Sequence, residues 1–369
     1  MRLLITATSL RSAYGGPAFS VSQLASALAS RGVSTGIWAA DGSAAESELL
    51  PAAAQVERLD GPLADAARTF APDVIHDNGL WLPHNHGVAT LAREGGVPRL
   101  VSTRGMLEPW AVRHKGLKKK FAWRLYQRRD LERASALHTT AEAEAENLRS
   151  FGLAVPVITI PNGVELPELP TSPSVRDDRT RTALFLGRLY PVKGLPMLIE
   201  AWSKVRPPGW RLVIAGPDEA RHRGELELAV AATKLGDVVR FAGPVEGEAK
   251  AALLREADVL VLPSHSESFG MVVAEALAHG TPVLTTTAVP WPQLEQRGCG
   301  WRCAPTTDAI AEALRAITAR EAATLRSMGA AGRDLVAETL GWDGIAAQFA
   351  ALYRRLAENP AMVPAEVAA

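Results

Sequence analysis

The stretch DVLVLPSHSESFGMVVAEALAHG, residues 258–280, decides the fold and locates the chemistry. A short apolar run typical of a buried parallel strand leads into a polar loop, and a second apolar run ended by Gly280 is typical of a helix. The loop carries Glu267 and the helix carries Glu275. An ionised carboxylate in an apolar helix is costly unless it is paired. We therefore expect Glu275 to be satisfied by another protein group or by a bound ligand.

The same strand–helix alternation runs outward along the chain in both directions. Strand-like runs occur at LLITAT, VSTGIWA, DVIHD, RLVST, ALHTT and VPVITI, and again at TALFLG, WRLVIAG, VVRFAG and DVLVLP. Helix-like runs separate several of them, which favours parallel sheets with helices on both faces. The sequence thus predicts an α/β fold of two doubly wound, Rossmann-like domains that face each other across a cleft. Ligands bind such folds at the carboxyl ends of the strands.

A segment rich in Pro, Ser and charge, residues 165–180, interrupts the alternation and is interpreted as an interdomain linker. We expect an N-terminal domain over residues 1–165 and a C-terminal domain over residues 166–342. The last helix, within residues 343–369, is expected to pack back on the N-terminal domain.

Composition restricts the classes of function. The 369 residues carry a formal net charge of zero, so a field that attracts nucleic acid over the whole surface is not expected. Two cysteines are too few for a disulfide framework or a zinc site, and we expect reduced thiols. The N-terminus lacks the pattern of a signal peptide, and no apolar run approaches the roughly 20 residues of a membrane-spanning helix. We expect a cytoplasmic protein.

The second half opens with the strand ALFLG and the stretch GRLYPVKGLPMLIEAW, residues 187–202. Arg188 leaves the strand, and Lys193 lies just before a helix whose amino end already carries partial positive charge. An anion resting there would resolve the conflict, and two cations with backbone N–H groups suit a diphosphate. The alternative is that both are solvated surface charges. If both proved to be locked in internal ion pairs, the diphosphate interpretation would fail.

The 258–280 stretch supplies the other half of the expected site. Gly270 would let the backbone approach a ligand, and the first N–H groups of the following helix can bind phosphate or sugar oxygens. Glu267 is then placed at the rim of the cleft. Glu275, more than one turn inside, could accept hydrogen bonds from a ribose diol, unless it is paired structurally.

The ordered motifs G-R-L-x-x-x-K-G and E-S-F-G-M-V-V-A-E resemble the donor site of retaining GT-B glycosyltransferases of family 4. The double glycine at 15–16 and the IPNGV turn at 160–164 also fit that family, so the resemblance covers nearly the whole chain. It implies catalytic roles for Arg188, Lys193 and Glu267. It also implies a donor site made of the following residues: Gly16, Phe269, Gly270, Met271, Val272 and Glu275.

In that family's chemistry, negative charge grows on the leaving diphosphate, where Arg188 and Lys193 would stabilise it. Gly16 would bring its N–H to the phosphates, and Glu267 would hold hydroxyls of the transferred sugar. The chain has no D-x-D motif, so we expect no metal and no cofactor beyond the nucleotide-diphosphate sugar. The resemblance implies retention by same-face attack, with the leaving phosphate oxygen accepting the acceptor's proton.

The first half is expected to bind the acceptor. His76, Trp81, His84 and Arg104 are predicted at strand exits, where the tryptophan could stack on a sugar ring. Many relatives carry His-Gly where this chain has Arg104 and Gly105; an arginine cannot act as a base at neutral pH, so we assign it to binding. A structural role remains the alternative for each histidine. The RGMLEPW pattern resembles a branch that builds bacterial exopolysaccharide or lipopolysaccharide.

The basic stretch RHKGLKKKFAWRLYQRRDLER, residues 113–133, interleaves aromatic residues with cations. It could rest on an anionic membrane near a lipid-linked acceptor, or it could be a solvated helix whose aromatic residues face the core.

The expected function is transfer of a sugar from a nucleotide-diphosphate donor to a glycan or lipid-linked acceptor. Two rival classes are a nicotinamide oxidoreductase and a non-catalytic sugar-binding protein. The first requires a G-x-G-x-x-G spacing that SAYGGPAFS lacks, and the second is usually exported. The donor base, the sugar, the acceptor and the oligomeric state stay open.

Overall fold

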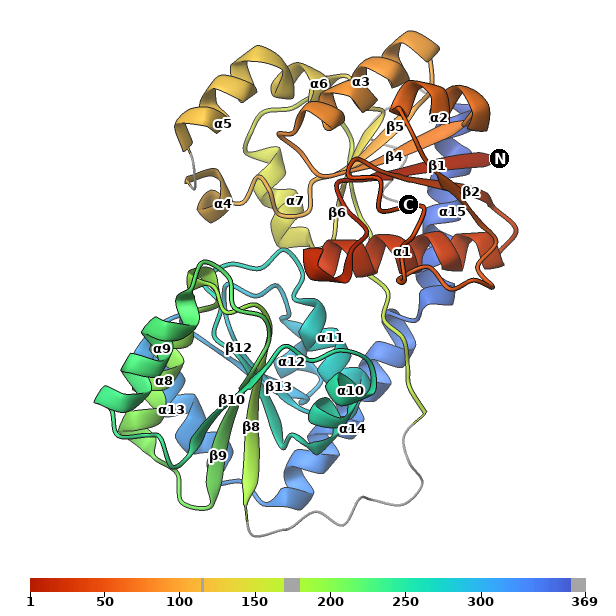
Figure 1. Ribbon diagram of the computed structural model, residues 1–369. Helices are drawn as coiled ribbons and strands as arrows, with labels where there is room; N and C mark the ends of the chain where they lie inside the picture. Colours follow the sequence, from red (N-terminus) through yellow and green to blue (C-terminus); the bar gives the residue numbers. More distant parts are fainter. Residues whose placement is uncertain (114–115, 169–179, 360–369) are drawn as a thin grey trace. The chain divides into compact units, whose positions relative to one another are not determined.

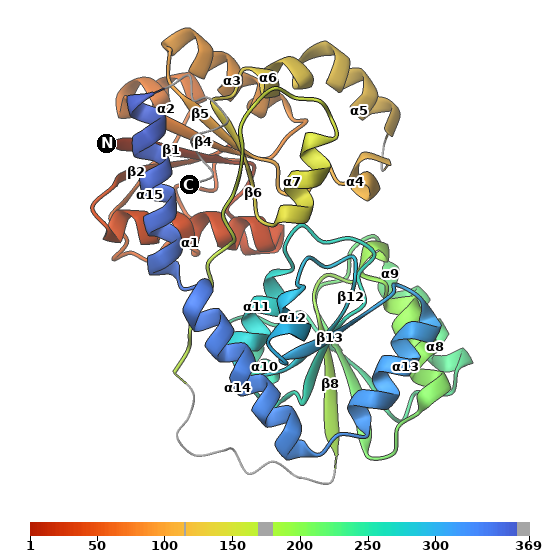
Figure 2. The same ribbon diagram turned by 180° about the vertical axis from the view of Figure 1, so that it is seen from behind.

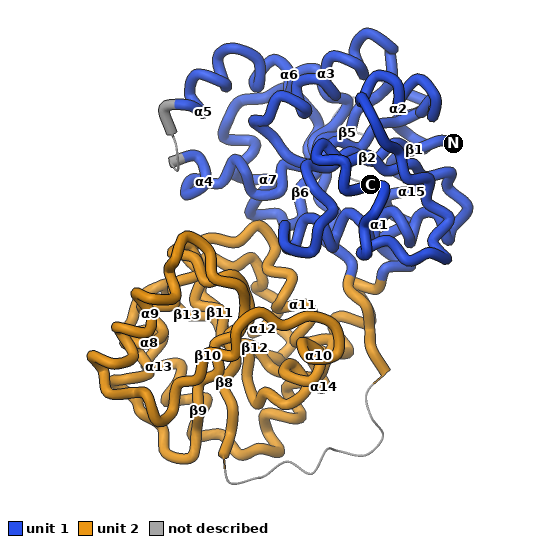
Figure 3. Tube along the Cα trace, in the orientation of Figure 1, with its two compact units in different colours: residues 1–163, 342–369 blue, residues 164–341 orange. Residues whose placement is uncertain are grey.

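A computed structural model describes residues 1–113, 116–168 and 180–359. The chain forms two compact units, coloured separately in Figure 3. Unit 1 comprises Met1–Gly163 together with the C-terminal part from Trp342, and unit 2 comprises Val164–Gly341. Most of the expected linker at 165–180 lies outside the described residues, as do residues 114–115 of the basic stretch.

Each unit is built on a parallel sheet, which confirms the predicted fold class of two doubly wound domains. Strand order is β3-β2-β1-β4-β5-β6-β7 in unit 1 and β10-β9-β8-β11-β12-β13 in unit 2. The strands of unit 1 are β1 (Arg2–Ala7), β2 (Ser34–Ala39), β3 (Val56–Leu59), β4 (Val74–Asn78), β5 (Arg99–Ser102), β6 (Ala136–Thr139) and β7 (Val157–Thr159). Those of unit 2 are β8 (Arg181–Leu186), β9 (Trp210–Ala215), β10 (Val239–Gly243), β11 (Val259–Leu262), β12 (Val283–Thr286) and β13 (Gly300–Cys303).

Helices connect and cover the strands. In unit 1 they are α1 (Gly16–Ser30), α2 (Leu63–Phe70), α3 (Pro83–Gly95), α4 (Pro109–Arg113), α5 (Gly116–Ala122), α6 (Arg128–Glu132), α7 (Glu142–Arg149) and α15 (Trp342–Glu358), with a 3-10 turn η1 (Ser12–Tyr14) and a π-helical turn η2 (Trp123–Gln127). In unit 2 they are α8 (Leu195–Val205), α9 (His222–Ala232), α10 (Gly247–Glu256), α11 (Met271–Ala278), α12 (Gln293–Gln296), α13 (Thr307–Thr318) and α14 (Ala322–Thr339), with a 3-10 turn η3 (Pro191–Lys193). None of the helices in the described ranges is both long and apolar enough to cross a bilayer.

The unit 1 core has two sides because successive side chains of a strand point to opposite faces. Leu3 and Ile5 of β1 pack in a cluster with side chains of α1 and α15, whereas Leu4 packs in a cluster with side chains of α2 and α3. Figure 1 shows these helix pairs on opposite sides of the unit 1 sheet. Because helices cover both faces of the sheet, β1 is an almost continuous apolar run in the sequence.

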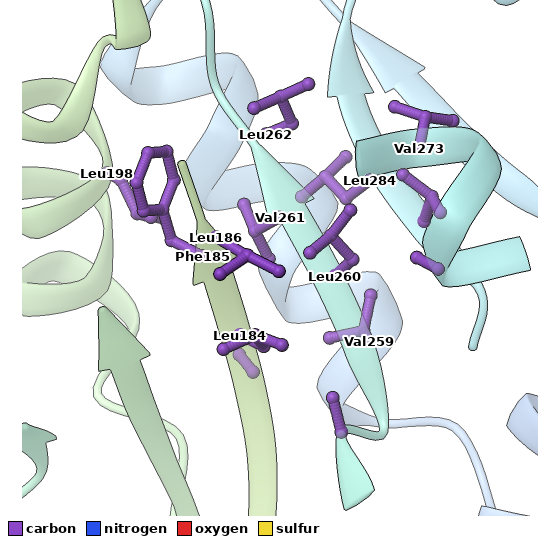
Figure 4. Packing of buried hydrophobic residues seen from close by; sticks show 14 of the residues in the cluster. Leu184, Phe185, Leu186, Leu198, Val259, Leu260, Val261, Leu262, Val273 and Leu284 are labelled. Atoms are coloured by element: carbon purple, nitrogen blue, oxygen red, sulfur yellow. The ribbon is translucent and has the colours of Figure 1, made fainter. Parts of the chain in front are cut away.

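Unit 2 repeats this plan, and Figure 4 shows its central strands. Leu184 and Leu186 of β8 and the apolar run of β11 are buried, with Leu198 of α8 and Val273 of α11 packed nearby. Within this unit, α8 packs on α13 and α11 packs on α14; Figure 2 shows the two pairs on either side of the sheet. The apolar stretch of residues 258–280 is therefore a buried strand followed by a core helix.

The last helix, α15, lies along α1 in unit 1. Phe349 and Tyr353 on its buried face reach the sheet, and the Tyr353 hydroxyl lies 2.7 Å from Nδ1 of His76 in β4. Helix α15 thus completes the core of the unit that opened the chain.

Strand order fixes where ligands can bind. In each sheet the order of strands reverses once, between β1 and β4 in unit 1 and between β8 and β11 in unit 2. The loops at the carboxyl ends of these neighbours diverge to opposite faces and leave a crevice, which is where doubly wound folds bind ligands. Each unit therefore offers one such position.

Candidate functional site

In unit 2 the loops that follow β8 and β11 are tied together. The His265 amide donates to the Val192 carbonyl at 2.8 Å. Gly194 has a φ of +69°, and a Cβ at that position would lie 2.1 Å from the Pro263 carbonyl oxygen. Only glycine permits this approach, which fixes Lys193 beside the loop that carries Glu267.

Lys193 and Glu267 form an ion pair at this position. Nζ of Lys193 lies 2.6 Å from Oε1 of Glu267, and that oxygen also accepts from the Ser264 hydroxyl at 2.7 Å. The side chains are 17% and 12% exposed, so the pair is shielded from bulk water but can be reached. A cation and a carboxylate are thus held together at the carboxyl ends of the two central strands.

Arg188 has a carboxylate partner too. Its guanidinium donates to Glu219, which follows β9. Both side chains are roughly half exposed, at 48% and 42%. Each of the two predicted cations thus has an acidic neighbour, and the diphosphate interpretation depends on whether both pairs are locked. An exposed pair of this kind is typically worth only about 0–1 kcal/mol, so Arg188 is not locked and can exchange its partner for a ligand.

The helix after Glu267 begins at Met271 and is preceded by Gly270, whose φ of +80° is a left-handed conformation that favours glycine. The Phe269 ring is buried against Trp291, and the Phe269 carbonyl accepts from the Trp291 indole at 2.6 Å. Phe269 therefore anchors the loop, and any contact it makes with a ligand comes from its backbone. Met271 and Val272 form the first turn, whose N–H groups have no partner within the helix.

Glu275 has a protein partner. Its Oε1 lies 2.7 Å from Nζ of Lys250 in α10, and the two side chains are 23% and 30% exposed. This ion pair answers the question raised by the apolar helix, and it was missed because nothing in the sequence links Lys250 to Glu275. Both groups still reach solvent, so the pair can also meet a ligand.

The position between β1 and β4 in unit 1 contains a pocket. Its lining includes Thr8 after β1, Asn78 and Gly79 at the end of β4, and Arg104. Tyr14, at the end of η1, and Pro17, in the first turn of α1, also line it. The predicted residue Gly16 is the first residue of that helix.

Arg104 is held in this pocket by neutral groups. Its Nε and Nη2 donate to Oδ1 of Asn78 at 3.1 and 2.7 Å, and Nη1 donates to Ser20 and Asn162 at 3.2 and 3.0 Å. Burial lowers the pKa of Arg104 to about 10, and the charge on Glu144 opposes that shift. The guanidinium remains charged at neutral pH.

The remaining predicted acceptor residues differ from one another in position. His84 is the second residue of α3, with Nε2 3.2 Å from the Thr8 hydroxyl, so it borders the same pocket. Burial lowers the pKa of His84. Trp81, in the loop after β4, is held by its backbone: its N–H donates to Gln127 and its carbonyl accepts from Tyr126.

His76 does not lie at a strand exit, and that prediction is wrong. It is the third residue of β4 and is fully buried. Its Nδ1 accepts from the Tyr353 hydroxyl, and its Nε2 lies 2.7 Å from the Ser102 hydroxyl. The Ser102 hydroxyl also contacts Nδ1 of His138, whose Nε2 donates to the Ile160 carbonyl. His76 is thus part of an internal network below the pocket.

The basic stretch carries both apolar side chains that pack inward and apolar side chains that are exposed. Trp123 packs against Trp81 and Phe151, which places part of its aromatic surface inward. Phe121 and Leu125, one helical turn apart, are 69% and 65% exposed. Among the side chains described in this stretch, six cations are exposed: Lys118, Lys120, Arg124, Arg128, Arg129 and Arg133.

Other chemistry is sparse. In the described ranges, no three His, Cys, Asp or Glu side chains come together as a metal site would require. Cys299 and Cys303 are both free thiols. Burial raises the pKa of both thiols, for Cys303 to about 11, so neither is a reactive thiolate at neutral pH.

Comparison with known proteins gives the same division of the chain. The family model "Glycosyl transferases group 1" matches residues 172–335, and the model "Glycosyl transferase 4-like domain" matches residues 15–163. A D-inositol 3-phosphate glycosyltransferase of Actinosynnema mirum is 30% identical, over 85% of this chain and 87% of that protein. A glycogen synthase of Mycobacterium tuberculosis is 33% identical, over 78% of this chain and 69% of that protein.

Solved structures share the architecture. A sucrose-phosphate synthase from Thermosynechococcus elongatus superposes with a TM-score of 0.78 at 23% identity, covering 96% of this chain and 99% of the other. Anabaena HepE, solved in complex with UDP and glucose, superposes with a TM-score of 0.75 at 19% identity, covering 96% and 100%. At these identities the likeness establishes a shared fold.

Proposed function

Because the chain belongs to the glycosyltransferases of the GT4 type, with the GT-B fold, we propose that it is a retaining, metal-independent transferase that moves a sugar from a nucleotide-diphosphate sugar to a glycan or lipid-linked acceptor in bacterial polysaccharide synthesis. The observation that carries the proposal is the Lys193–Glu267 pair, placed beside the first turn of α11 at the carboxyl ends of β8 and β11. A cation, a carboxylate and helix N–H groups at one position match a diphosphate joined to a sugar.

The reaction assigns separate tasks to this pair. As the glycosidic bond breaks, the leaving diphosphate gains negative charge, which Lys193, Arg188 and the α11 N–H groups stabilise. Glu267 accepts hydrogen bonds from the sugar hydroxyls. Ser264 already orients that carboxylate, so it needs little reorganisation. Gly16 contributes a backbone N–H to the phosphates.

Glu275 binds the ribose hydroxyls in this proposal. Its carboxylate lies one turn into α11 and keeps access to solvent beside Lys250. The leaving phosphate oxygen accepts the acceptor's proton as the acceptor attacks from the same face, which gives retention without a protein nucleophile. Three cationic or dipolar groups in one unit supply the charge stabilisation that a metal would otherwise provide.

Acceptor binding is assigned to the unit 1 pocket, through Arg104, His84 and the neighbouring Trp81. His76 is buried below this pocket, so it supports the pocket residues and does not itself contact the acceptor. The relatives named above act on very different acceptors by name, and the wide range fits a pocket built mainly from loop residues.

The test is a panel of UDP-, GDP- and ADP-sugars incubated with the purified protein and a chelator. We expect release of one nucleoside diphosphate at a rate unaffected by the chelator. With an acceptor present, NMR should show the anomeric configuration of the donor preserved in the product. Inversion of configuration, or a rate abolished by the chelator and restored by a divalent metal, would each contradict the corresponding part of the proposal.

We further propose a cytoplasmic location with peripheral contact to an anionic membrane. Phe121 and Leu125 are exposed on one helical turn, with Lys118, Lys120 and Arg124 around them. Such a pattern inserts its apolar side chains at the headgroup boundary while each cation near the surface contributes about 1 kcal/mol.

Liposome flotation tests the membrane contact. Vesicles containing anionic lipid should bind the wild type, and the double variant Phe121→Ser with Leu125→Ser should lose most of that binding. Leu228, 73% exposed in unit 2, provides the control: Leu228→Ser should bind as the wild type does. Equal partitioning of all three proteins would favour a merely solvated helix.

A further inference from the structure

We propose that contact of the basic stretch with an anionic membrane is coupled to the loop after β4, and that Tyr126 and Gln127 are the positioning residues that couple it to Trp81. The inference rests on the proposed function, because it joins the proposed membrane contact to the unit 1 pocket. It adds regulation to that pocket: the wall beside Trp81 becomes ordered when the stretch is docked on a membrane.

The basic stretch has an outer and an inner face within a few residues. Phe121 and Leu125 are 69% and 65% exposed, whereas Gln127 is 3% exposed. Trp123 lies between them in the chain and packs on Trp81, with ring centroids 6.2 Å apart. The residues that would enter a membrane therefore share one helical segment with residues that contact the loop after β4.

Trp81 is held by both of its backbone polar groups. Its N–H donates to Oε1 of Gln127 at 2.7 Å, and its carbonyl accepts from the Tyr126 hydroxyl at 2.6 Å. Both partners lie in the π-helical turn η2. Turns of this kind interrupt the regular α-helix and recur at functional sites. One turn of one helix thus fixes a residue that lies 45 positions from Tyr126 in the chain.

The backbone of Trp81 is strained and needs this support. Its φ of +76° lies in the left-handed region, which bulky residues rarely adopt. Such a conformation persists only where the surrounding structure enforces it, and it occurs at switch regions for that reason. The two hydrogen bonds from η2 enforce it here. The turn at Trp81 is therefore an element with a strained and a relaxed state, and ordering of η2 favours the strained one.

Contacts continue from Trp81 to the wall of the pocket. The Trp81 indole donates to the Met106 carbonyl at 3.3 Å, and the N–H of Leu80 lies 3.1 Å from Sδ of Met106. Met106 and Gly79 both line the pocket. A Cβ on Gly79 would lie 3.4 Å from the Met106 methyl group. Relaxation of the Trp81 turn would therefore displace residues that line the pocket.

The inner end of the basic stretch is fixed to the rest of unit 1. Asp130 in α6 is buried, its Oδ2 lies 2.7 Å from Nδ1 of His86, and its carbonyl accepts from the buried Arg99. The Tyr126 ring also packs on the His86 ring, with centroids 5.0 Å apart. Because α6 is anchored in this way, ordering of the outer residues acts on η2, the turn that holds Trp81.

Amide hydrogen exchange of the full chain tests the proposal, with and without vesicles of equimolar phosphatidylglycerol and phosphatidylcholine. In the wild type, vesicles should slow exchange in the peptide that covers residues 79–83 by about fivefold, the scale that one hydrogen bond sets. The double variant Phe121→Ser with Leu125→Ser should show no slowing, because its contact with the vesicles is lost.

Tyr126→Phe isolates the coupling from the membrane contact. It keeps the ring but loses the hydrogen bond to the Trp81 carbonyl. In flotation it should bind vesicles as the wild type does, and it should lose most of the slowing at residues 79–83. The matched control is Tyr190→Phe, which removes a hydroxyl from a half-buried tyrosine of unit 2. That variant should show the same slowing as the wild type.

The ratio of the exchange rates with and without vesicles distinguishes coupling from a structural role. If Tyr126 only supports the fold, Tyr126→Phe raises both rates and leaves their ratio unchanged, which would overturn the proposal. Vesicles that bind the wild type without slowing exchange at residues 79–83 would overturn it too. Absence of vesicle binding by the wild type would overturn both this inference and the membrane contact. Neither measurement requires turnover, so failure of the proposed transfer reaction would appear separately, in the nucleotide-sugar panel.

Discussion

The two positions where the strand order reverses hold their cations in opposite ways. In unit 2, Lys193 faces the carboxylate of Glu267 at 2.6 Å. In unit 1, Arg104 is surrounded by the amide oxygens of Asn78 and Asn162. A cation beside a carboxylate is neutralised until a ligand separates the pair, whereas a cation among amides keeps its whole charge. The first arrangement suits a ligand with both anionic and hydroxyl groups, and the second suits a simple anion.

The largest expected effect is on the paired cation. Lys193→Ala should lower turnover by about 10²-fold, as loss of a preorganised donor to developing charge typically does. Lys204→Ala is the matched control, because Lys204 pairs with Glu200 and Asp308 on the exposed side of α8. Steady-state release of nucleoside diphosphate measures both. Wild-type turnover in Lys193→Ala would show that this lysine does not stabilise the leaving diphosphate. The difference between its surroundings and those of Arg104 would then have no consequence for the reaction.

A second, smaller effect separates binding from chemistry within unit 2. Glu275→Ala should weaken nucleoside diphosphate affinity by about tenfold, the value of a hydrogen bond to a charged group. Turnover at saturation should change less, because the ribose does not react. Glu338→Ala, which breaks the exposed pair with Arg297, should leave affinity unchanged. Calorimetry reads out the difference, and unaltered affinity in Glu275→Ala would make its pair with Lys250 purely structural.

The smallest effect concerns the histidine network below the unit 1 pocket. Burial lowers the pKa of His138 to about 3, from its ordinary value of 6.5, and burial likewise lowers the pKa of His76. Below pH 6.5 the unfolded chain therefore binds protons that the folded chain excludes. The free energy of unfolding should fall as the pH falls, by about 1 kcal/mol per histidine between pH 8 and pH 6.

Chemical denaturation at the two pH values measures this loss, and His138→Gln should reduce it. His265→Gln, at an exposed position in unit 2, is the control and should leave it unchanged. If the wild type and His138→Gln lose the same free energy of unfolding, His138 is not a cause of the pH dependence.

Apolar runs predicted most of the fold, because both sheets are covered on two faces and the central strands β1, β8 and β11 are largely apolar. The strands that escaped prediction are β3, β12 and β13, each of four residues. Their conformation is decided by pairing within the sheets, since β3 pairs with β2, β12 with β11, and β13 with β12.

For the site, the sequence located the motif residues but not the partners that they contact. The motifs located Lys193, Glu267 and Glu275 because their spacing along one loop or helix is local. The partners were not predictable, since Lys193 and Glu267 lie 74 positions apart and His76 and Tyr353 lie 277 apart. Only the topology brings such residues together. His76 was misplaced for this reason: its burial depends on α15, the last helix of the chain.

A crystal structure of the protein with a bound nucleoside diphosphate tests the central claim most directly. We predict that the diphosphate contacts Lys193 Nζ and the first turn of α11, with the ribose on Glu275 and the Lys193–Glu267 pair opened. A nucleotide bound away from the carboxyl ends of β8 and β11, with that pair intact, would contradict the account.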